Sequence, residues 1–206
     1  MIEAKGLVKK YGKFVAVDNL SMTLDVGESV VLLGANGSGK STLMSMLALV
    51  LKPTEGEVLI DGQKGKKAKS KIAYAPQNIV LFEELTVTEN LYAWSSLKGK
   101  ENVERAEYLI SELDIGSFKK KRVDRLSGGQ RRRVNIAVAM MGNYDYLFLD
   151  EPLAGIDERG AECIEAILRK EKESGRGILL TEHNPTILLP LMDRQLKLDG
   201  GHFKEG

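Results

Sequence analysis

The chain has 206 residues, of which 43% are hydrophobic, and its 30 Lys and Arg nearly balance its 29 Asp and Glu. This length suits one domain with its own core, and the net charge of +1 gives no overall field that would indicate a nucleic-acid binder. Cys163 is the single cysteine, which excludes an internal disulfide and a multi-cysteine metal site and favours a reducing compartment. Neither a signal peptide nor an apolar run of about 18 residues is present. We therefore expect a soluble, cytoplasmic protein that reaches a membrane only through a partner.

Short strands are predicted at the start of the chain. Ile2 to Val8 and Phe14 to Val26 flank a turn at Lys10 to Lys13, and apolar and polar residues alternate near the end of the second segment. This pattern predicts an antiparallel β layer before the first glycine-rich loop.

That loop, Gly34 to Thr42, reads GANGSGKST and fits the pattern G-x-x-x-x-G-K-[ST]. An apolar strand, Glu28 to Leu33, precedes it, and a helical segment rich in Leu and Met, Thr42 to Leu51, follows it. In this context the glycines let backbone N–H groups converge at a positive helix end, where a polyphosphate binds. Lys40 then contacts the β- and γ-phosphates, and the Ser41 hydroxyl ligates Mg²⁺. The flanking elements favour this interpretation over a glycine-rich turn with an accidental Lys-Ser pair.

Several aromatic and basic residues have two interpretations each. Tyr11 is either half-buried packing or a stacking partner for adenine. The lysines between Lys64 and Lys71 are expected in a solvated loop, with contact to acidic lipid headgroups or a partner as the alternative. Phe82, Tyr92 and Trp94 are expected in the core, with a docking surface as the alternative.

Two further strands, Glu57 to Ile60 and Ile72 to Ala75, precede a segment with helical periodicity that we interpret as an insertion between strands. Thr86 or Thr88 is predicted to cap a first helix, and a second runs from Glu101 to Leu113. The residues expected on the buried face of the second helix are Val103, Ala106, Ile110 and Leu113.

A second glycine motif, Leu126 to Gln130 (LSGGQ), precedes a predicted helix from Arg131 to Met140. Two glycines and a serine before a helix form an N-terminal anion nest, although the same pattern also serves as a helix cap. Arg131 to Arg133 are expected on the exposed face of this helix.

The run Tyr146 to Glu151 (YLFLDE) predicts a central parallel strand, buried on both faces, that brings carboxylates to the C-terminal edge of the sheet. Asp150 is suited to hold Mg²⁺, directly or through water, and Glu151 to polarise an attacking water. A solvated strand end is the alternative.

The rest of the chain predicts a helix from Glu158 to Ser174 and a buried strand from Gly177 to Thr181. His183 follows that strand, with the position and the proton for a γ-phosphate oxygen. A last helix from Asn184-Pro185 and a closing hairpin around Gly200-Gly201 are expected.

In this order the motifs resemble the nucleotide-binding subunit of ABC transporters, from Tyr11 to His183, and LSGGQ is that family's signature. The resemblance implies that Gln77 is the Q-loop glutamine, Glu151 the catalytic glutamate and Gly155 to Asp157 the D-loop. The residues that it implies in catalysis are Glu151, His183, Gln77 and Lys40. The residues that it implies in nucleotide binding are Tyr11, Asn36, Gly37, Ser38, Gly39, Lys40, Ser41, Thr42, Ser127, Gly128, Gly129, Gln130 and Asp157. The residues that it implies in metal binding are Ser41, Gln77 and Asp150, with ATP and Mg²⁺ as the ligands.

The resemblance also implies an α/β fold: a P-loop NTPase core with a mainly parallel sheet, an N-terminal antiparallel β subdomain and an inserted helical signature subdomain. The core is expected at residues 1–77 and 144–206 and the helical subdomain at 78–143. Two nucleotide-binding domains, as a homodimer or a heterodimer, are expected to pair head to tail. ATP on the loop Gly34 to Thr42 of one, which the resemblance identifies as Walker A, would be covered by Ser127 and Gly129 of the other. A transmembrane permease is expected to dock between Gln77 and Trp94, at the cytoplasmic face of the membrane, and no nucleic acid is expected.

The subgroup resembles exporter ATPases of the drug, lipid and antibiotic type, with heme-exporter ATPases as near neighbours. The segment Val134 to Met140 departs from the Ala-Arg-Ala that is usual in the family, and Asn184 stands where Asp is common. Two alternatives are a soluble ABC-type ATPase that acts on nucleic acid or a scaffold protein, and a non-hydrolysing regulatory subunit. The presence of Glu151 argues against the second.

Overall fold

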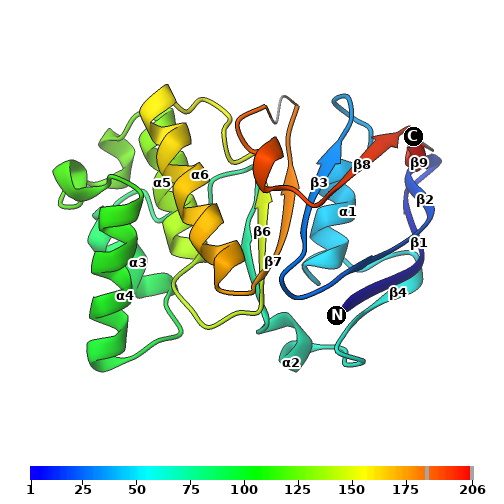
Figure 1. Ribbon diagram of the computed structural model, residues 1–206, viewed down its shortest axis with the longest axis horizontal. Coiled ribbons are helices and arrows are strands. Elements are labelled where there is room, and N and C mark those ends of the chain that lie inside the picture. The colour runs from blue at the N-terminus through cyan, green and yellow to red at the C-terminus, as the bar shows by residue number, and fades with distance from the viewer. Residues whose placement is uncertain (184–185, 205–206) are drawn as a thin grey trace.

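The chain is built around a six-stranded sheet, described here from a computed structural model for residues 1–183 and 186–204 (Figure 1). The strand order is β5-β6-β7-β3-β8-β9. These strands are Ile72–Ala75 (β5), Tyr146–Asp150 (β6), Gly177–Thr181 (β7), Ser29–Leu33 (β3), Arg194–Asp199 (β8) and His202–Lys204 (β9). The first five run parallel, and β9 closes the edge antiparallel to β8. The predicted mainly parallel sheet and closing hairpin are confirmed.

A separate antiparallel sheet contains β2 (Phe14–Leu24), β1 (Ile2–Tyr11) and β4 (Glu55–Ile60), in that order. The expected antiparallel layer is thus confirmed, and a strand from beyond the glycine-rich loop completes it. The turn is shorter than predicted, because β1 continues to Tyr11, which pairs with Phe14.

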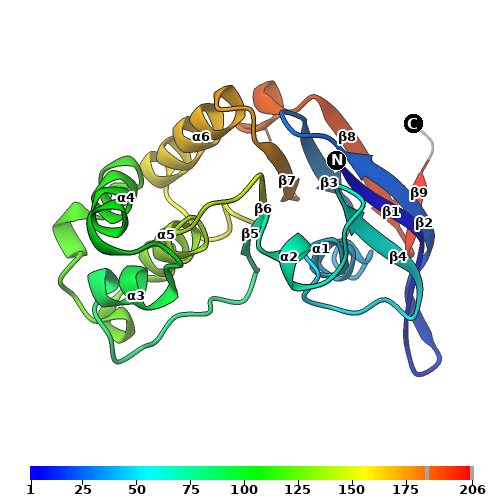
Figure 2. The ribbon, with the colours of Figure 1, turned by 90° about the horizontal axis from the view of Figure 1, so that it is seen from below.

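Helices cover both faces of the six-stranded sheet. They are α1 (Lys40–Leu47), α2 (Lys66–Lys69), α3 (Val87–Trp94), α4 (Gly99–Glu112), α5 (Gly128–Ala139) and α6 (Glu158–Glu173). α1 packs between the two sheets, α5 and α6 cover the opposite face, and α3 and α4 lie beyond them (Figure 2). Within residues 1–183 and 186–204, no helix is both long and apolar enough to cross a membrane. The subdomain boundaries at 78 and 143 stay a prediction.

The strand β6 shows why the central strands are apolar along their whole length. Tyr146 and Phe148 pack in the cluster around α1, whereas Leu147 and Leu149 pack in the cluster around α5 and α6. Successive side chains of a strand point to opposite faces, and both faces are covered here. The charged group of β6 is therefore confined to its end, at Asp150.

The helix α5 is buried on more sides than its periodicity predicts. Arg132 and Arg133, expected on an exposed face, are each 8% exposed. The Arg133 guanidinium donates to the carbonyls of Leu113 and Asp114, and that of Arg132 donates to the carbonyl of Pro76. Their donors satisfy backbone carbonyls of segments distant in sequence, so the pattern within α5 could not reveal their burial.

Three other expectations need correction. Val103, in the second turn of α4, is 48% exposed, whereas the other three residues of its predicted face lie in the buried cluster around α5 and α6. The lysine-rich loop contains the one-turn helix α2, whose Ala68 is buried. Phe82, Tyr92 and Trp94 are exposed, and the rings of Phe82 and Trp94 stack with their centroids 5.4 Å apart.

The segment after His183 also differs from its prediction. The expected last helix begins at Asn184-Pro185, which lies outside the described residues. From Thr186 onward the chain forms turns and a short 3₁₀ helix at Leu189–Leu191. Leu188 and Leu191 are buried in the cluster around α5 and α6, so apolar packing rather than a regular helix holds this segment.

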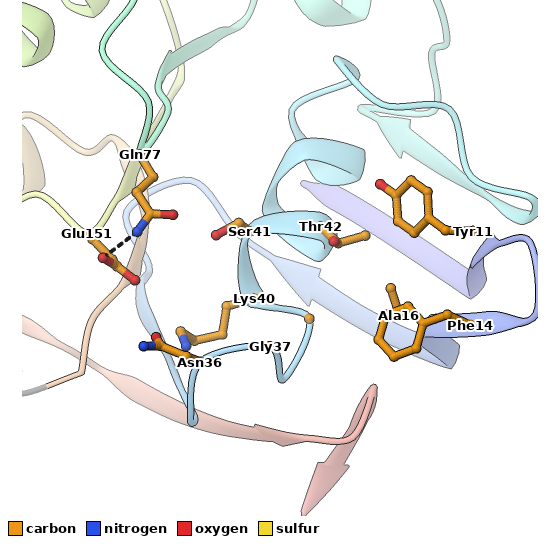
Figure 3. A pocket seen from close by; sticks show the side chains of 11 residues that line it. Tyr11, Phe14, Ala16, Asn36, Gly37, Lys40, Ser41, Thr42, Gln77 and Glu151 are labelled. Carbon is orange, nitrogen blue, oxygen red and sulfur yellow. Dashed lines mark hydrogen bonds between the residues drawn. The ribbon is translucent and has the colours of Figure 1, made fainter.

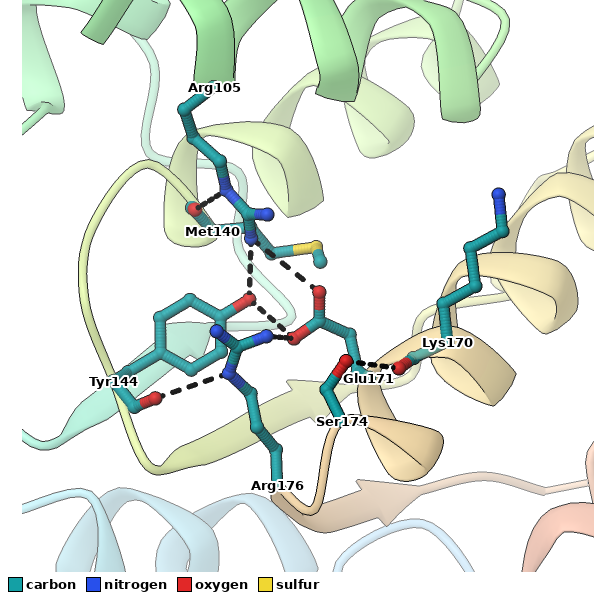
Figure 4. A network of polar contacts seen from close by, with 7 residues as sticks. All are labelled: Arg105, Met140, Tyr144, Lys170, Glu171, Ser174 and Arg176. Atoms are coloured by element: carbon teal, nitrogen blue, oxygen red, sulfur yellow. Dashed lines mark hydrogen bonds and ion pairs between the residues drawn. The ribbon is translucent and has the colours of Figure 1, made fainter. Parts of the chain in front are cut away.

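A buried polar network joins α4 to the end of α6 (Figure 4). Glu171 accepts a hydrogen bond from the Tyr144 hydroxyl at 3.0 Å and pairs with Arg176 at 2.5 Å. Arg105 lies 3.6 Å from the other carboxylate oxygen of Glu171, and it also donates to the Tyr144 hydroxyl and the Met140 carbonyl. Burial raises the pKa of Tyr144, so its hydroxyl stays a donor. Paired charges and satisfied donors together offset the desolvation of Glu171.

We expect Glu171→Gln to lower the free energy of unfolding by about 3 kcal/mol, because it leaves two largely buried guanidinium groups without an opposite charge. Urea denaturation monitored by circular dichroism measures this loss. Glu112→Gln is the matched control, since Glu112 also links α4 to α6, through a surface pair with Lys170 at 2.7 Å. The control should cost under about 1 kcal/mol. Equal losses for the two variants would show that burial adds nothing to the Glu171 network.

Candidate functional site

The C-terminal ends of β3, β6 and β7 meet at one edge of the sheet, because these strands are neighbours and run parallel. Ligands of open α/β sheets bind at this edge. A pocket of about 400 Å³ opens there, between the glycine-rich loop, Gln77 with Glu151, and the hairpin of β1 and β2 (Figure 3). Its lining residues are Tyr11, Phe14, Ala16, Asn36, Gly37, Gly39, Lys40, Ser41, Thr42, Gln77 and Glu151.

Two glycines let the loop approach its neighbours closely. A Cβ on Gly34 would lie 2.2 Å from the carbonyl oxygen of Leu198, and one on Gly39 would lie 2.4 Å from that of Ala16. Gly39 also has a positive φ of 104°, which favours glycine. The loop is therefore held between β8 and β2. The N-terminal end of α1, whose first N–H groups have no partner within the helix, borders the pocket.

Lys40 is the predicted phosphate-binding cation, and its ammonium lies within the loop. Nζ donates to the carbonyls of Gly34 at 2.8 Å and Ala35 at 3.0 Å, and the side chain is buried. An ammonium has three N–H donors, so these two bonds leave one for a ligand. Ser38, also predicted in the site, is buried. Its N–H donates to the Ala35 carbonyl, and its carbonyl accepts from the Gly201 N–H.

Oxygen atoms gather at the end of β6. Asp150 Oδ1 accepts hydrogen bonds from the Ser41 hydroxyl at 3.2 Å and from the Thr181 hydroxyl at 2.5 Å. The structure thus brings together Ser41 and Asp150, which are distant in sequence, as the motifs predict. Carboxylate and hydroxyl oxygens are the hard donors that Mg²⁺ prefers. Thr181 was not predicted here, although a polar residue at the end of an apolar strand is a signal that could have found it.

Glu151 is held from three sides. Its backbone has a φ of 51°, a left-handed conformation that is costly for a residue with a side chain, and its N–H donates to the carbonyl and hydroxyl oxygens of Thr181. Gln77 Nε2 donates to Oε2 of the carboxylate at 2.8 Å (Figure 3). His183 Nε2 lies 3.0 Å from Oε1. Two predicted residues from separate segments therefore converge on the carboxylate of a third.

The opposite end of the pocket is aromatic. Tyr11 and Phe14 are 51% and 60% exposed, and both line the pocket (Figure 3). Exposed rings beside a phosphate-binding loop provide a flat surface on which a nucleobase can stack. Phe14 was missed, although an aromatic residue that pairs with Tyr11 across a two-residue turn is a usable signal.

The signature residues lie away from this pocket. Ser127 caps α5, accepting from the Gln130 N–H at 3.2 Å, while the Gln130 side chain accepts from the Ser127 N–H at 3.1 Å. Gly128 follows this cap, and Asp157 caps α6 by accepting from Gly160 N–H at 3.0 Å. A Cβ on Gly129 would lie 2.8 Å from the carbonyl oxygen of Gly155, so the signature presses against the predicted D-loop.

Comparison with known proteins identifies the family. The model of the family described as "ABC transporter" matches residues 17–154. The chain belongs to this family. It is 34% identical to the lipopolysaccharide export system ATP-binding protein LptB of Haemophilus influenzae, over 98% of this chain and 88% of that one. It is also 34% identical to the linearmycin resistance ATP-binding protein LnrL of Bacillus subtilis, over 98% of this chain and 68% of that one.

Solved ABC cassettes have the same fold. A dimeric, post-hydrolysis structure of the cassette MJ0796 with ADP and Pi matches with a TM-score of 0.89 at 28% identity, covering 100% of this chain and 97% of that one. A second dimeric structure of MJ0796, with the same coverage and identity, gives 0.90. This ABC protein is therefore the ATP-binding subunit of a transporter, and it is an ATPase with the predicted P-loop NTPase fold.

We expect Lys40→Ala to weaken ATP binding at least about tenfold, because a charge-assisted hydrogen bond to phosphate contributes about 1.5 to 3 kcal/mol. Isothermal titration with ATP measures the change in Kd. Lys100→Ala is the control, since Lys100 pairs with Glu104 on the surface of α4. Unchanged affinity in Lys40→Ala would show that this cation does not contact the phosphates.

Proposed function

We propose that this subunit powers an exporter by closing with a second nucleotide-binding domain, head to tail, around ATP, and by opening after hydrolysis. The observation that carries the proposal is the separation of two anion nests. One nest, at Lys40 and the start of α1, lines the pocket, whereas the other, at Ser127 and Gly129, lies at the start of α5 outside it. A single copy thus surrounds a triphosphate on one side. A second copy supplies the missing nest and excludes water.

Glu151 is the proposed general base for hydrolysis. Its carboxylate accepts a proton from a water molecule, whose oxygen attacks the γ-phosphorus while the bond to the ADP oxygen breaks, giving ADP and phosphate. Gln77 and His183, which contact the two carboxylate oxygens of Glu151, orient the base and the γ-phosphate. The strained backbone of Glu151 supports this role, since such strain concentrates at functional sites.

Ser41 and Asp150 are the proposed holders of Mg²⁺. Their oxygens already lie 3.2 Å apart, so the donor set suits the ion. The ion supplies charge neutralisation on the β- and γ-phosphates when it is bound. Gln77 is the third residue proposed to bind the metal. Its side-chain NH₂ donates to Glu151, so its side-chain carbonyl oxygen remains available to the ion.

A groove beside the Q-loop is the proposed docking site for the permease. It has a volume of about 480 Å³ and lies between α1, β5 and α5, with Val50, Val80 and Trp94 exposed along it. The stacked ring of Phe82 extends this apolar surface. Exposed aromatic and aliphatic side chains of this kind are typical of protein interfaces. Docking here places the subunit at the cytoplasmic face of a membrane, and the names of LptB and LnrL, an export and a resistance protein, support export.

The proposal predicts that Glu151→Gln forms an ATP-dependent dimer. Glutamine keeps the size of the side chain but cannot accept the proton, so ATP persists between the subunits. Size-exclusion chromatography with light scattering should show a doubling of mass with Mg-ATP and a monomer with ADP.

Ser127→Arg in the same background is the control. A long cation at the second nest should block closure, while a single subunit retains its ATP affinity. A dimer of Glu151→Gln, Ser127→Arg would contradict the head-to-tail arrangement. A monomer of Glu151→Gln that binds ATP would contradict homodimerisation.

A further inference from the structure

The Q-loop of this chain is held by a buried asparagine of α5. Asn135 is 3% exposed, and its side chain spans the loop that carries Gln77. Nδ2 donates to the carbonyl of Pro76 at 3.2 Å, and Oδ1 accepts from the N–H of Val80 at 3.1 Å. Residues 76–80 belong to no helix or strand, so these two bonds anchor a segment that lacks regular backbone pairing.

Arg132 makes a second contact to the same point. Arg132 lies one turn before Asn135 on α5 and is largely buried. Its guanidinium donates to the Pro76 carbonyl at 3.3 Å. Burial lowers the pKa of Arg132, and the nearby carboxylates of Glu151, Asp150 and Glu182 oppose this shift. Two side chains of one helix face therefore converge on the residue that precedes Gln77.

The placement of Asn135 is unfavourable unless its bonds are functional or strongly stabilising. Asparagine is a poor helix former, and a buried amide without partners costs about 1 to 3 kcal/mol. The neighbouring positions Val134 and Ile136 are apolar and fully buried. An apolar residue at position 135 would fill the same space without this cost, but it could not hold the Q-loop.

We propose that Asn135 is a positioning residue for Gln77. By holding Pro76 and Val80 it fixes the backbone from which Gln77 Nε2 reaches Glu151 Oε2 at 2.8 Å. The same residue makes α5 a rigid link within one subunit, because Asn135 lies eight residues, or about 12 Å, from Ser127 along the helix. This link between the two ATP sites rests on the proposed head-to-tail dimer. In that dimer, ATP bound to the partner contacts Ser127 of this subunit, and α5 transmits the contact to Gln77 in this subunit's own ATP site.

Hydrogen exchange of the monomer tests the anchor itself. In Asn135→Ala, the Val80 amide should exchange at least about tenfold faster than in the parent protein, without nucleotide, because it loses its acceptor. Tyr144→Phe is the matched control. It removes a buried hydroxyl bonded to Arg105 and Glu171, remote from the pocket, and should leave the exchange of this amide unchanged. Equal exchange in Asn135→Ala and the parent would overturn the proposal.

A kinetic double-mutant cycle tests whether Asn135 acts through Gln77. We expect Asn135→Ala to lower kcat for ATP about tenfold with KM changed less than about twofold, because a displaced Gln77 no longer orients Glu151. In a Gln77→Ala background, the same change should alter kcat less than about twofold. A tenfold loss in both backgrounds, or the same loss in Tyr144→Phe, would reduce Asn135 to a structural role.

Cooperativity tests the link between sites separately from the anchor. The link predicts a Hill coefficient for ATP above 1 in the parent ATPase and close to 1 in Asn135→Ala; a coefficient of 1 in the parent, or an unchanged one in the variant, overturns the link. If Glu151→Gln fails to dimerise, homodimerisation fails, and the link between two copies of this chain fails with it. The exchange and the double-mutant cycle still decide the positioning role in that case.

Discussion

Burial of β3, β6 and β7 on both faces is the constraint on which the rest of the structure depends. A strand covered on both sides has no place along its length for a charge, so polar chemistry begins where each apolar run ends. Leu33 is followed by Gly34, and Leu149 by Asp150. Because the strands are parallel neighbours, their ends share one edge, and the glycine loop meets Asp150 and Thr181 there. The location of the site is thus a consequence of how the core is packed.

Local sequence patterns could predict those parts of the site whose chemistry lies within a few consecutive residues. The loop from Gly34 to Thr42, the acids that end β6 and His183 are of this kind, and the structure brings them together around one pocket. Their individual roles in binding and hydrolysis stay predictions. Arg132 and Asn135 could not be found in this way. Their partner, the Pro76 carbonyl, is remote in sequence, and a polar residue in a helix is normally expected at the surface.

The same reasoning explains which parts of the fold were predictable. Apolar runs bounded by glycine or acidic residues located β3, β6 and β7 to within a few residues, because burial on both faces leaves a strong pattern. The pairing between strands was harder to predict from the sequence. β4 joins the N-terminal sheet by pairing with β1, although the glycine loop and α1 lie between the two strands in the sequence. The Glu171 network was also hidden, since Glu, Arg and Tyr in an amphipathic helix or loop suit a solvated face equally well.

Side chains of the two nests and of the predicted D-loop already have hydrogen-bond partners within the protein, although Lys40 keeps one N–H for a ligand. Lys40 donates to two loop carbonyls, Ser127 accepts from Gln130 N–H, and Asp157 accepts from Gly160 N–H. A phosphate that replaces such a partner exchanges an existing hydrogen bond for a stronger charged one, so its net gain is smaller than the full strength of a new bond. This balance suits the proposed cycle. A closed pair held by such reduced net gains can reopen once cleavage separates the γ-phosphate.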